Sequence, residues 1–308
     1  MATMKAVRVH AFGGPDVLKI EQIQRPEPGP GEVLIKVHAA GVNPVDWKVR
    51  EGYNNHELPL IPGWDVAGVI ESTGSFVKGL KTGDQVYGYF DIARDGAYAD
   101  YVAVPAAEVT LKPRSLDYTQ AAAIPLAALS AWQALFDAGG LRAGQKILAH
   151  GAAGGVGSFA VQLAKWKGAY VVGTASSGNL QFVRDLGANE VIDYTRTRFE
   201  DVVHDADMVL DTLGGETQKR SWRVLKKGGI LVSLPSRPSE KEAAAHGVRQ
   251  AYFNVRPNTA QLTEITALVD SGKLRPIVES VLPLADARLA QELSQAGHTR
   301  GKIVLKVW

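Results

Sequence analysis

The spacing of apolar and polar residues divides this chain into three parts. In the first third, short apolar or alternating runs are separated by turns rich in glycine and proline, which is typical of strands. The predicted strands are Lys5–Val9, Glu32–Val37, Val66–Glu71, Gln85–Tyr89 and Tyr98–Val104. Many short strands at this spacing predict a small barrel or sandwich.

The middle of the chain alternates strand-like and helix-like segments. A helix capped by Asp117 and interrupted at Pro125, then a helix over Ser130–Ala138, lead into it. Strands are predicted at Lys146–His150, Tyr170–Thr174, Asp207–Asp211 and Gly229–Leu234, and helices at Val156–Lys167, Asn179–Leu186 and Thr217–Lys226. This alternation predicts βαβ units and a parallel sheet covered by helices.

The last fifty residues mix both element types. Helices are predicted at Thr259–Ser271 and Ala285–Ala296, and strands at Val278–Leu282 and Lys302–Val307.

Composition narrows the function classes. The chain has 308 residues, enough for two domains, and a net charge of +2, which argues against nucleic acid as a partner. It has no apolar stretch long enough to span a membrane and no secretory signal, so a cytoplasmic protein is expected. The absence of cysteine excludes disulfides, thiolate nucleophiles and cysteine-containing zinc sites.

A glycine-rich loop, His150–Gly157, follows a predicted strand and opens a predicted helix. This is the context of a dinucleotide-binding turn, in which backbone amides at the helix start bind the pyrophosphate. The match to the usual glycine pattern is imperfect, because Ala152 stands in the first glycine position. The alternative is a tight turn that binds no ligand.

The end of the next strand bears on the choice of cofactor. An NAD site usually has an acid there for the ribose 2′-hydroxyl, whereas this chain has Ser176 and Ser177. Hydroxyl groups suit a 2′-phosphate, so NADP(H) is favoured. The alternative is that the two serines only cap the helix that starts near Asn179.

Four motifs in this order carry a family resemblance: Gly41–Asp46, Pro62–Gly68, Ala152–Gly157 and Gly301–Leu305. The chain resembles the medium-chain dehydrogenase/reductase superfamily, in its quinone oxidoreductase (zeta-crystallin-like) and enone/alkenal reductase branch. The resemblance implies an α/β fold with a GroES-like β-barrel catalytic domain at residues 1–122. It further implies a Rossmann NADP(H)-binding domain with a doubly wound parallel sheet at residues 123–258, a return to the first domain at 259–308, and an active site in the cleft between the domains.

The resemblance also implies that no metal is bound. The zinc branch carries a Cys in the first motif and a His in the second, where this chain has Asn43 and Trp64. A short loop at residues 88–98 replaces the lobe that holds structural zinc. Asp46 is interpreted as structural and Trp64 as a packing residue, and one of Tyr87 and Tyr89 could face the cleft.

The site residues are likewise what the resemblance implies. Asn43 would orient the nicotinamide or the substrate, Lys48 would reach the cofactor phosphate and ribose, and Tyr53 would lie at the mouth of the pocket, although each also has a purely structural explanation. The remaining expected cofactor contacts are Ala153, Gly154, Gly155, Val156, Thr174, Ser176, Ser177, Asn179, Tyr194, Leu213, Gly214, Ser233, Leu234, Pro235, Phe253, Asn254, Val255, His298 and Thr299. Relatives often have a lysine at Asn179 that pairs with the 2′-phosphate, and Arg184 or Arg196 could replace it.

The implied activity is hydride transfer from NADPH to a quinone or an α,β-unsaturated carbonyl compound. Two alternatives remain open: a reductase of acyl or nitro compounds, and an NADPH-binding protein without turnover. The expected partners are a small-molecule substrate and a second copy of the chain, joined through a sheet-edge strand such as Gln250–Val255.

Overall fold

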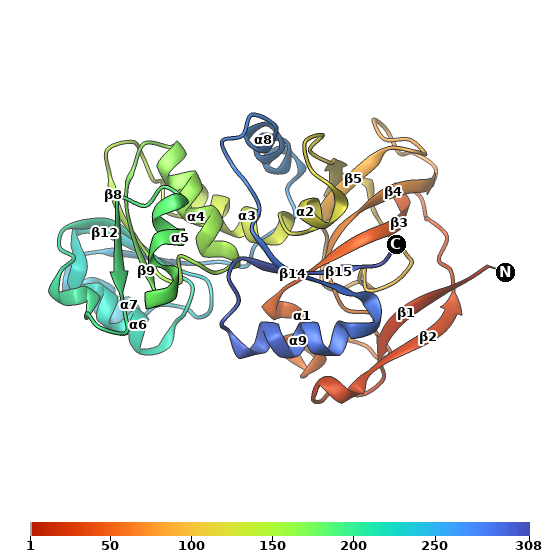
Figure 1. Cartoon of the computed structure of the whole chain (residues 1–308), viewed down its shortest axis with the longest axis horizontal. Helices are drawn as coiled ribbons and strands as arrows, with labels where there is room; N and C mark the ends of the chain where they lie inside the picture. Colours follow the sequence, from red (N-terminus) through yellow and green to blue (C-terminus); the bar gives the residue numbers. More distant parts are fainter. Residues whose placement is uncertain (1) are drawn as a thin grey trace. The chain divides into compact units, whose positions relative to one another are not determined.

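The structure, a computed structural model, describes residues 2–308 and divides into two compact units (Figure 1). The first unit contains the chain up to Leu129 together with Arg256–Gly272 and Pro276–Trp308, and the second contains Ser130–Val255 and Lys273–Arg275. The boundary falls within helix α3 (Pro125–Trp132), later than the expected residue 123. No helix among residues 2–308 is long and apolar enough to cross a membrane.

The first unit is built on antiparallel strands. Its elements are β1 (Thr3–Val9), β2 (Leu18–Gln24), β3 (Glu32–Val42), β4 (Asp65–Thr73), β5 (Gln85–Tyr89), β6 (Tyr101–Pro105), β7 (Val109–Leu111), α1 (Pro44–Arg50), α2 (Tyr118–Ala122) and α8 (Thr259–Asp270). All five predicted strands of the first third are present, whereas β2 and β7 were missed. Strand β2 has no fully buried residue and β7 has only three residues, so neither has a clear apolar alternation.

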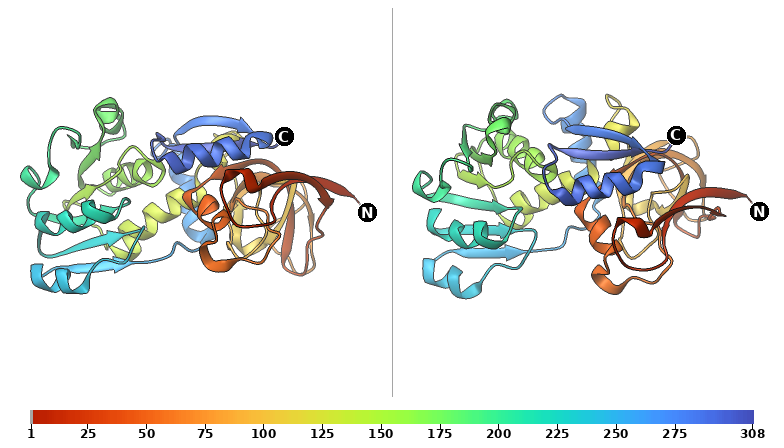
Figure 2. Two further views of the ribbon diagram at one scale, coloured as in Figure 1. Left: turned by 90° about the horizontal axis from the view of Figure 1, so that it is seen from below. Right: turned by 60° about the horizontal axis from the view of Figure 1, so that its bottom comes forward.

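The C-terminal segment is part of the first unit's sheet. The strand order is β14-β15-β3-β4-β5-β7, with β6 paired to β3. Strand β15 (Lys302–Lys306) pairs antiparallel with β3 and parallel with β14 (Val278–Pro283), so these blue strands lie beside the orange β3 in Figure 1. Helix α9 (Ala287–Ala296) lies along β14 and β15 in both views of Figure 2.

The second unit is a six-stranded parallel sheet with connecting helices. The strands are β8 (Lys146–Ala149), β9 (Tyr170–Ala175), β10 (Glu190–Asp193), β11 (Ala206–Asp211), β12 (Leu225–Ser233) and β13 (Arg249–Tyr252). The helices include α4 (Gly155–Trp166), α5 (Leu180–Asp185), α6 (Gly215–Ser221) and α7 (Glu240–His246). The order β10-β9-β8-β11-β12-β13 is that of a doubly wound Rossmann sheet, which confirms the prediction for this unit.

The prediction around Pro125 was wrong in detail. Pro125 starts helix α3, and the chain then widens into a π-helical segment, Gln133–Ala138, instead of a regular helix over Ser130–Ala138. Proline fits the first position of a helix because its missing N–H has no partner there in any case.

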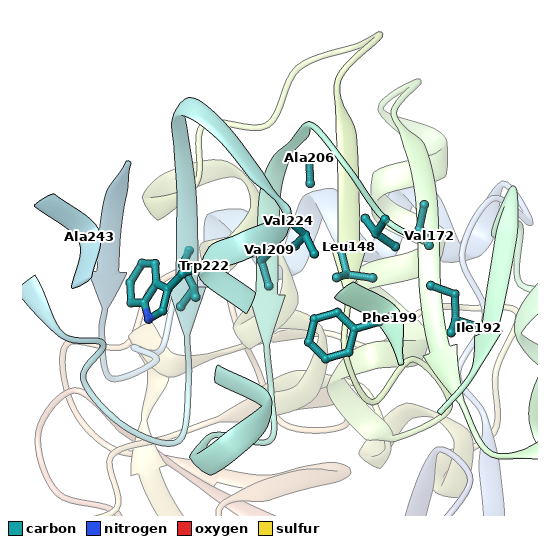
Figure 3. Packing of buried hydrophobic residues seen from close by; sticks show 11 residues of the cluster. Leu148, Val172, Ile192, Phe199, Ala206, Val209, Trp222, Val224 and Ala243 are labelled. Carbon is teal, nitrogen blue, oxygen red and sulfur yellow. The ribbon is translucent and has the colours of Figure 1, made fainter. Parts of the chain in front are cut away.

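One core cluster packs against the parallel sheet. Figure 3 shows Phe199 and Trp222 among aliphatic side chains from β8, β9, β10 and β11, with each aromatic side chain 3% exposed. Burying side chains of this size stabilises the unit by about 2–3 kcal/mol each. The cluster therefore fixes the strands whose ends carry the candidate cofactor residues.

The turn that follows β4 contains a strained residue. Phe76 has a φ of 67° and is 84% exposed, so its ring gains little from packing. A bulky side chain in the left-handed region costs about 1–2 kcal/mol, and glycine avoids that cost.

We expect Phe76→Gly to raise the free energy of unfolding by about 0.5–1 kcal/mol, after the greater backbone entropy of glycine in the unfolded chain is subtracted. The matched control is Gly79→Ala in the same loop between β4 and β5, at a φ of 79° with open space around it. It should lower the free energy by about 1 kcal/mol. Urea denaturation of the three proteins measures both changes, and a less stable Phe76→Gly protein would refute the strain.

Candidate functional site

The glycine-rich loop connects β8 to the start of α4. Gly151 has a φ of 61°, and Gly154 is the N-cap of α4 without a side-chain cap. A Cβ atom on Gly157 would lie 2.1 Å from the carbonyl oxygen of Gly151, so only glycine lets the helix pack this closely on the loop. The first amides of the helix are thus left for an anion, and the donor set fits a dinucleotide pyrophosphate.

A second loop lies against the first at the point where the strand order reverses. The Thr212 hydroxyl donates to the carbonyl oxygen of His150 at 2.9 Å. The buried Asp211 carboxylate accepts the backbone N–H groups of Leu213 at 2.9 Å and Gly214 at 2.8 Å, which fixes the turn after β11. Dinucleotides bind at this position in doubly wound sheets.

The imidazole of His150 supports the loop from inside the unit. Its ring nitrogens lie 3.2 Å from the Thr174 hydroxyl and 3.0 Å from the Ser221 hydroxyl, and its ring packs edge-on against Phe199. Burial lowers the pKa of His150 to about 4, so the ring is neutral at physiological pH. His150 is therefore a structural residue that holds β8, β9 and α6 together.

Two expected cofactor residues have their side chains bonded inside the unit. Thr174 is 2% exposed and contacts His150 through its hydroxyl. The buried Ser233 hydroxyl donates to Asp211 at 2.9 Å and accepts from Gln218. Any contact of these two residues with a cofactor would therefore use backbone groups.

The residues expected near the 2′-phosphate lie at the ends of β9 and β10. The Asn179 amide donates to the Ser176 hydroxyl at 3.1 Å, and the Ser177 hydroxyl donates to the Asp193 carboxylate at 2.5 Å. Asp193 precedes Tyr194, which is 56% exposed. Sequence reasoning missed Asp193, because β10 is short and was not predicted; the only available indication is an acid directly after Val191 and Ile192.

The hydrogen bonds from Ser177 and Thr195 lower the pKa of Asp193. This carboxylate is therefore charged at neutral pH, beside a hydroxyl that was expected to bind a phosphate. The residues at the end of β9 include no acid, so this carboxylate comes from the end of the neighbouring strand β10.

The other expected cofactor residues of the second unit follow the carboxyl ends of its strands. Ala153, Gly155 and Val156 belong to the β8–α4 connection, Leu234 and Pro235 follow β12, and Phe253, Asn254 and Val255 follow β13. In the first unit, His298 and Thr299 lie between α9 and β15.

A buried polar network lies in the first unit, centred on Lys302. Its ammonium group donates to the carbonyl oxygen of Val42 at 2.6 Å and to the Asn43 side-chain oxygen, and it lies 3.8 Å from the Asp65 carboxylate. The Asn43 amide nitrogen donates to Asp65 at 2.8 Å, and the other Asp65 oxygen accepts the Leu126 amide at 2.8 Å. Both ends of the Asn43 side chain are thus bonded within the unit.

This result changes the interpretation of Asn43. The residue is 1% exposed and precedes Pro44, at the point where α1 begins. Its observed bonds fix the start of this helix, with one amide N–H bonded to Asp65 and the side-chain oxygen bonded to Lys302, and its role toward a nicotinamide or substrate stays a prediction.

Asp46 supports the same helix start. Its carboxyl group accepts the Asn43 backbone N–H and the Tyr98 hydroxyl, each at 2.8 Å. Burial raises the pKa of Asp46 to about 7, and these hydrogen bonds and Lys302 only partly oppose the shift. These contacts agree with the structural interpretation of Asp46, although α1 occupies a stretch that was not predicted as a helix.

Lys48 and Tyr53 are the accessible members of the predicted catalytic set. The Lys48 ammonium lies 5.6 Å from the centre of the Trp47 ring, and it forms no ion pair among residues 2–308. Tyr53 is 43% exposed and follows Gly52, against which the Phe12 ring packs. Both side chains are therefore available to a small molecule.

The aromatic residues near the second motif serve packing. Trp64 is 1% exposed and donates its indole N–H to the carbonyl oxygen of Arg94 at 2.9 Å. The buried Tyr87 hydroxyl donates to the Leu262 carbonyl at 3.0 Å, and burial raises the pKa of Tyr89. The packing interpretation of Trp64 therefore agrees with its contacts.

Comparison with known proteins identifies the relatives of this chain. A model described as an alcohol dehydrogenase GroES-like domain matches residues 29–114, and one described as a zinc-binding dehydrogenase matches residues 186–305. An NADPH-dependent alkenal/one oxidoreductase of Arabidopsis thaliana, named as chloroplastic, is 39% identical over 316 residues, which cover 98% of this chain and 79% of the relative. A quinone oxidoreductase of Sus scrofa is 35% identical over 324 residues, which cover 98% and 97%.

The solved structure of a quinone oxidoreductase from Coxiella burnetii matches with a TM-score of 0.93 and 36% identity, over 100% of both chains. Together with the GroES-like match, this similarity confirms the predicted fold class.

The zinc in the second family description does not fit the residues of this chain. Residues 2–308 contain no cluster of three His, Cys, Asp or Glu side chains that could hold a metal ion. The two motif positions expected to carry zinc ligands hold Asn43 and Trp64, and the ammonium group of Lys302 already lies beside Asn43 and Asp65. A metal cation there would compete with a buried lysine, so no step of the chemistry is assigned to zinc.

Two neutral substitutions separate the roles of the buried acids. We expect Asp46→Asn to cost about 1–2 kcal/mol, because the new amide oxygen still accepts both hydrogen bonds while the amide nitrogen replaces a buried oxygen that has no partner. Asp65→Asn removes the charge partner of Lys302 and should cost about 3–5 kcal/mol.

Asp46→Asn should also weaken the pH dependence of stability. Folded Asp46, with its pKa near 7, keeps a proton that the unfolded chain releases near pH 4, so its contribution to stability falls as pH rises between these values. Urea denaturation at pH 4.5, 6 and 7.5 measures this slope. An unchanged slope in Asp46→Asn would show that Asp46 is charged throughout this range.

Proposed function

Because this chain belongs to the medium-chain dehydrogenase/reductase superfamily, in its zinc-independent branch, we propose that it is an NADPH-dependent oxidoreductase that reduces a quinone or an α,β-unsaturated carbonyl compound. One observation carries the cofactor part: the uncapped start of α4 opens where the order of a Rossmann sheet reverses. The printed names of the relatives support the acceptor classes.

The nicotinamide supplies the hydride when the cofactor is bound. The second unit's part in the proposal is to bind and orient the cofactor. The α4 amides around Gly155 and Val156 would hold the pyrophosphate, and Leu213 and Gly214 would lie along the ribose. Ser176, Ser177, Asn179 and Tyr194 would surround the adenosine phosphate.

The first unit's part is to stabilise charge on the acceptor. Hydride addition to the β-carbon of an enone, or to a quinone, places negative charge on a carbonyl oxygen, which needs a hydrogen-bond donor. Lys48 and Tyr53 carry accessible donors, the ammonium and the phenol. Asn43 and Asp46 would position them indirectly, by fixing the start of α1.

The other functions considered from the sequence have less support. A binding protein without turnover shares the fold, but the relatives described above are named as oxidoreductases. Assays with acyl and nitro compounds as acceptors test the alternative reductase activity. A cytoplasmic location also stays a prediction, since the Arabidopsis relative is named as chloroplastic.

Oxidation of NADPH, followed at 340 nm with simple quinones and alkenals, tests the proposal. Turnover with at least one of these acceptors is expected. Tight NADPH binding without turnover of any acceptor would favour the binding-protein alternative.

Tyr53→Phe and Lys48→Met should each reduce kcat by about tenfold to a hundredfold, because each removes one donor to the developing charge. The exposed Tyr170, in the second unit and bonded to Glu190, offers a control: Tyr170→Phe should leave kcat unchanged.

We also propose a homodimer formed through β13. This strand is the last in the sheet order, so its outer edge carries backbone groups that a second copy could pair with. Light scattering should give twice the 33.0 kDa mass of the chain, and a monomer at micromolar concentration would refute the dimer.

A further inference from the structure

The region expected to bind the 2′-phosphate lacks an obvious cation. Asn179 stands where a lysine was expected, and the structure adds the charged Asp193 beside Ser177. A phosphate near Ser177 would meet a carboxylate unless a cation lies in the same place, since like charges at this separation repel.

The chain after β10 supplies such a cation. The backbone N–H of Arg196 donates to the carbonyl oxygen of Asp193 at 3.1 Å, so the chain turns back toward the end of the strand. The Arg196 Nε atom lies 3.7 Å from the same Asp193 oxygen that accepts the Ser177 hydroxyl. The Arg196 side chain is 80% exposed, so most of its guanidinium donors face solvent.

The hydrogen bonds of Ser177 and Asp193 show which groups at this point are left for a phosphate. The Ser177 hydroxyl proton is directed at Asp193, and the Thr195 hydroxyl and backbone N–H donate to the other carboxylate oxygen at 2.6 and 3.0 Å. Ser177 therefore offers no free donor to a phosphate in this arrangement. The carboxylate thus lies beside both the Ser177 hydroxyl and the Arg196 guanidinium, at the ends of β9 and β10.

The neighbouring arginines are less suited to this role. Arg184 lies in the last turn of α5, at the end away from Asn179. Arg198 donates to Glu200 through two nitrogen atoms, at 3.0 and 2.9 Å, whereas Arg196 contacts Asp193 through Nε alone, so Arg198 has fewer donors left for a phosphate.

We propose that Arg196, held by Asp193, is the cation that binds the 2′-phosphate of NADPH. The planar guanidinium can donate two parallel hydrogen bonds to phosphate oxygens, and its charge offsets that of Asp193. This inference rests on the proposed NADPH-dependent function. It goes further in assigning the preference for NADPH over NADH to one side chain that sequence reasoning could not place.

Binding, measured separately from turnover, tests the assignment. Titration of Arg196→Gln with NADPH and NADH, followed by the fluorescence of the bound nicotinamide, should show NADPH affinity about tenfold weaker and NADH affinity changed less than twofold. Arg196→Lys should recover part of the NADPH affinity. Arg198→Gln, two residues away and similarly exposed, is the matched control and should leave both affinities unchanged.

Salt dependence provides a second readout. Raising the ionic strength should weaken NADPH binding by the wild type more than by Arg196→Gln, because a charge pair is screened. Unchanged NADPH affinity in Arg196→Gln, or equal losses for both cofactors, would overturn the assignment while leaving the proposed function intact. A wild-type protein that binds neither cofactor would overturn the proposed function, and this inference with it.

Discussion

The arrangement of the first unit depends on one buried ammonium group. Lys302, from the last strand, bonds the carbonyl of Val42 and the side chain of Asn43, and it balances the charge of Asp65. Without the lysine, a carboxylate with no exposed surface would have no nearby cation, which is among the most destabilising changes a protein interior can undergo. Since α1 starts directly after Asn43, the positions of the accessible side chains Lys48 and Tyr53 depend on this contact.

The second unit places its candidate residues by a different device. Its parallel strands end at one edge of the sheet, and buried polar side chains there bond to one another instead of to solvent. His150 connects β9 and α6, while Asp211 closes the turn after its own strand. Because these buried side chains already have hydrogen-bond partners within the unit, only backbone amides and a few exposed side chains are left for a ligand. Specificity then depends on which charged groups stand at the edge, as with Asp193 and Arg196.

Much of this architecture could be predicted from the sequence, because it follows from the local spacing of apolar, polar and small residues. The strands of the first third, the parallel sheet and the glycine-rich turn all follow from periodicity and small residues. The roles of individual polar residues could not be predicted in the same way. The bonds of Asn43 depend on Lys302, which lies 259 residues away, and the effect of Asp193 depends on its pairing with Ser177 across two strands. Short or polar strands such as β2 and β10 also escaped prediction, because their apolar alternation is weak.

The position of Lys302 after the second unit in the sequence has a consequence for biosynthesis. Strand β15 lies inside the first unit's sheet, between β14 and β3, and it is translated after the whole of the second unit. The N-terminal strands therefore lack β15, the neighbour of β3, while almost the whole of the second unit is translated as one continuous stretch. In this chain the order of completion is reversed: the later-encoded unit can fold during synthesis, and the first unit is completed only after β15 has been translated.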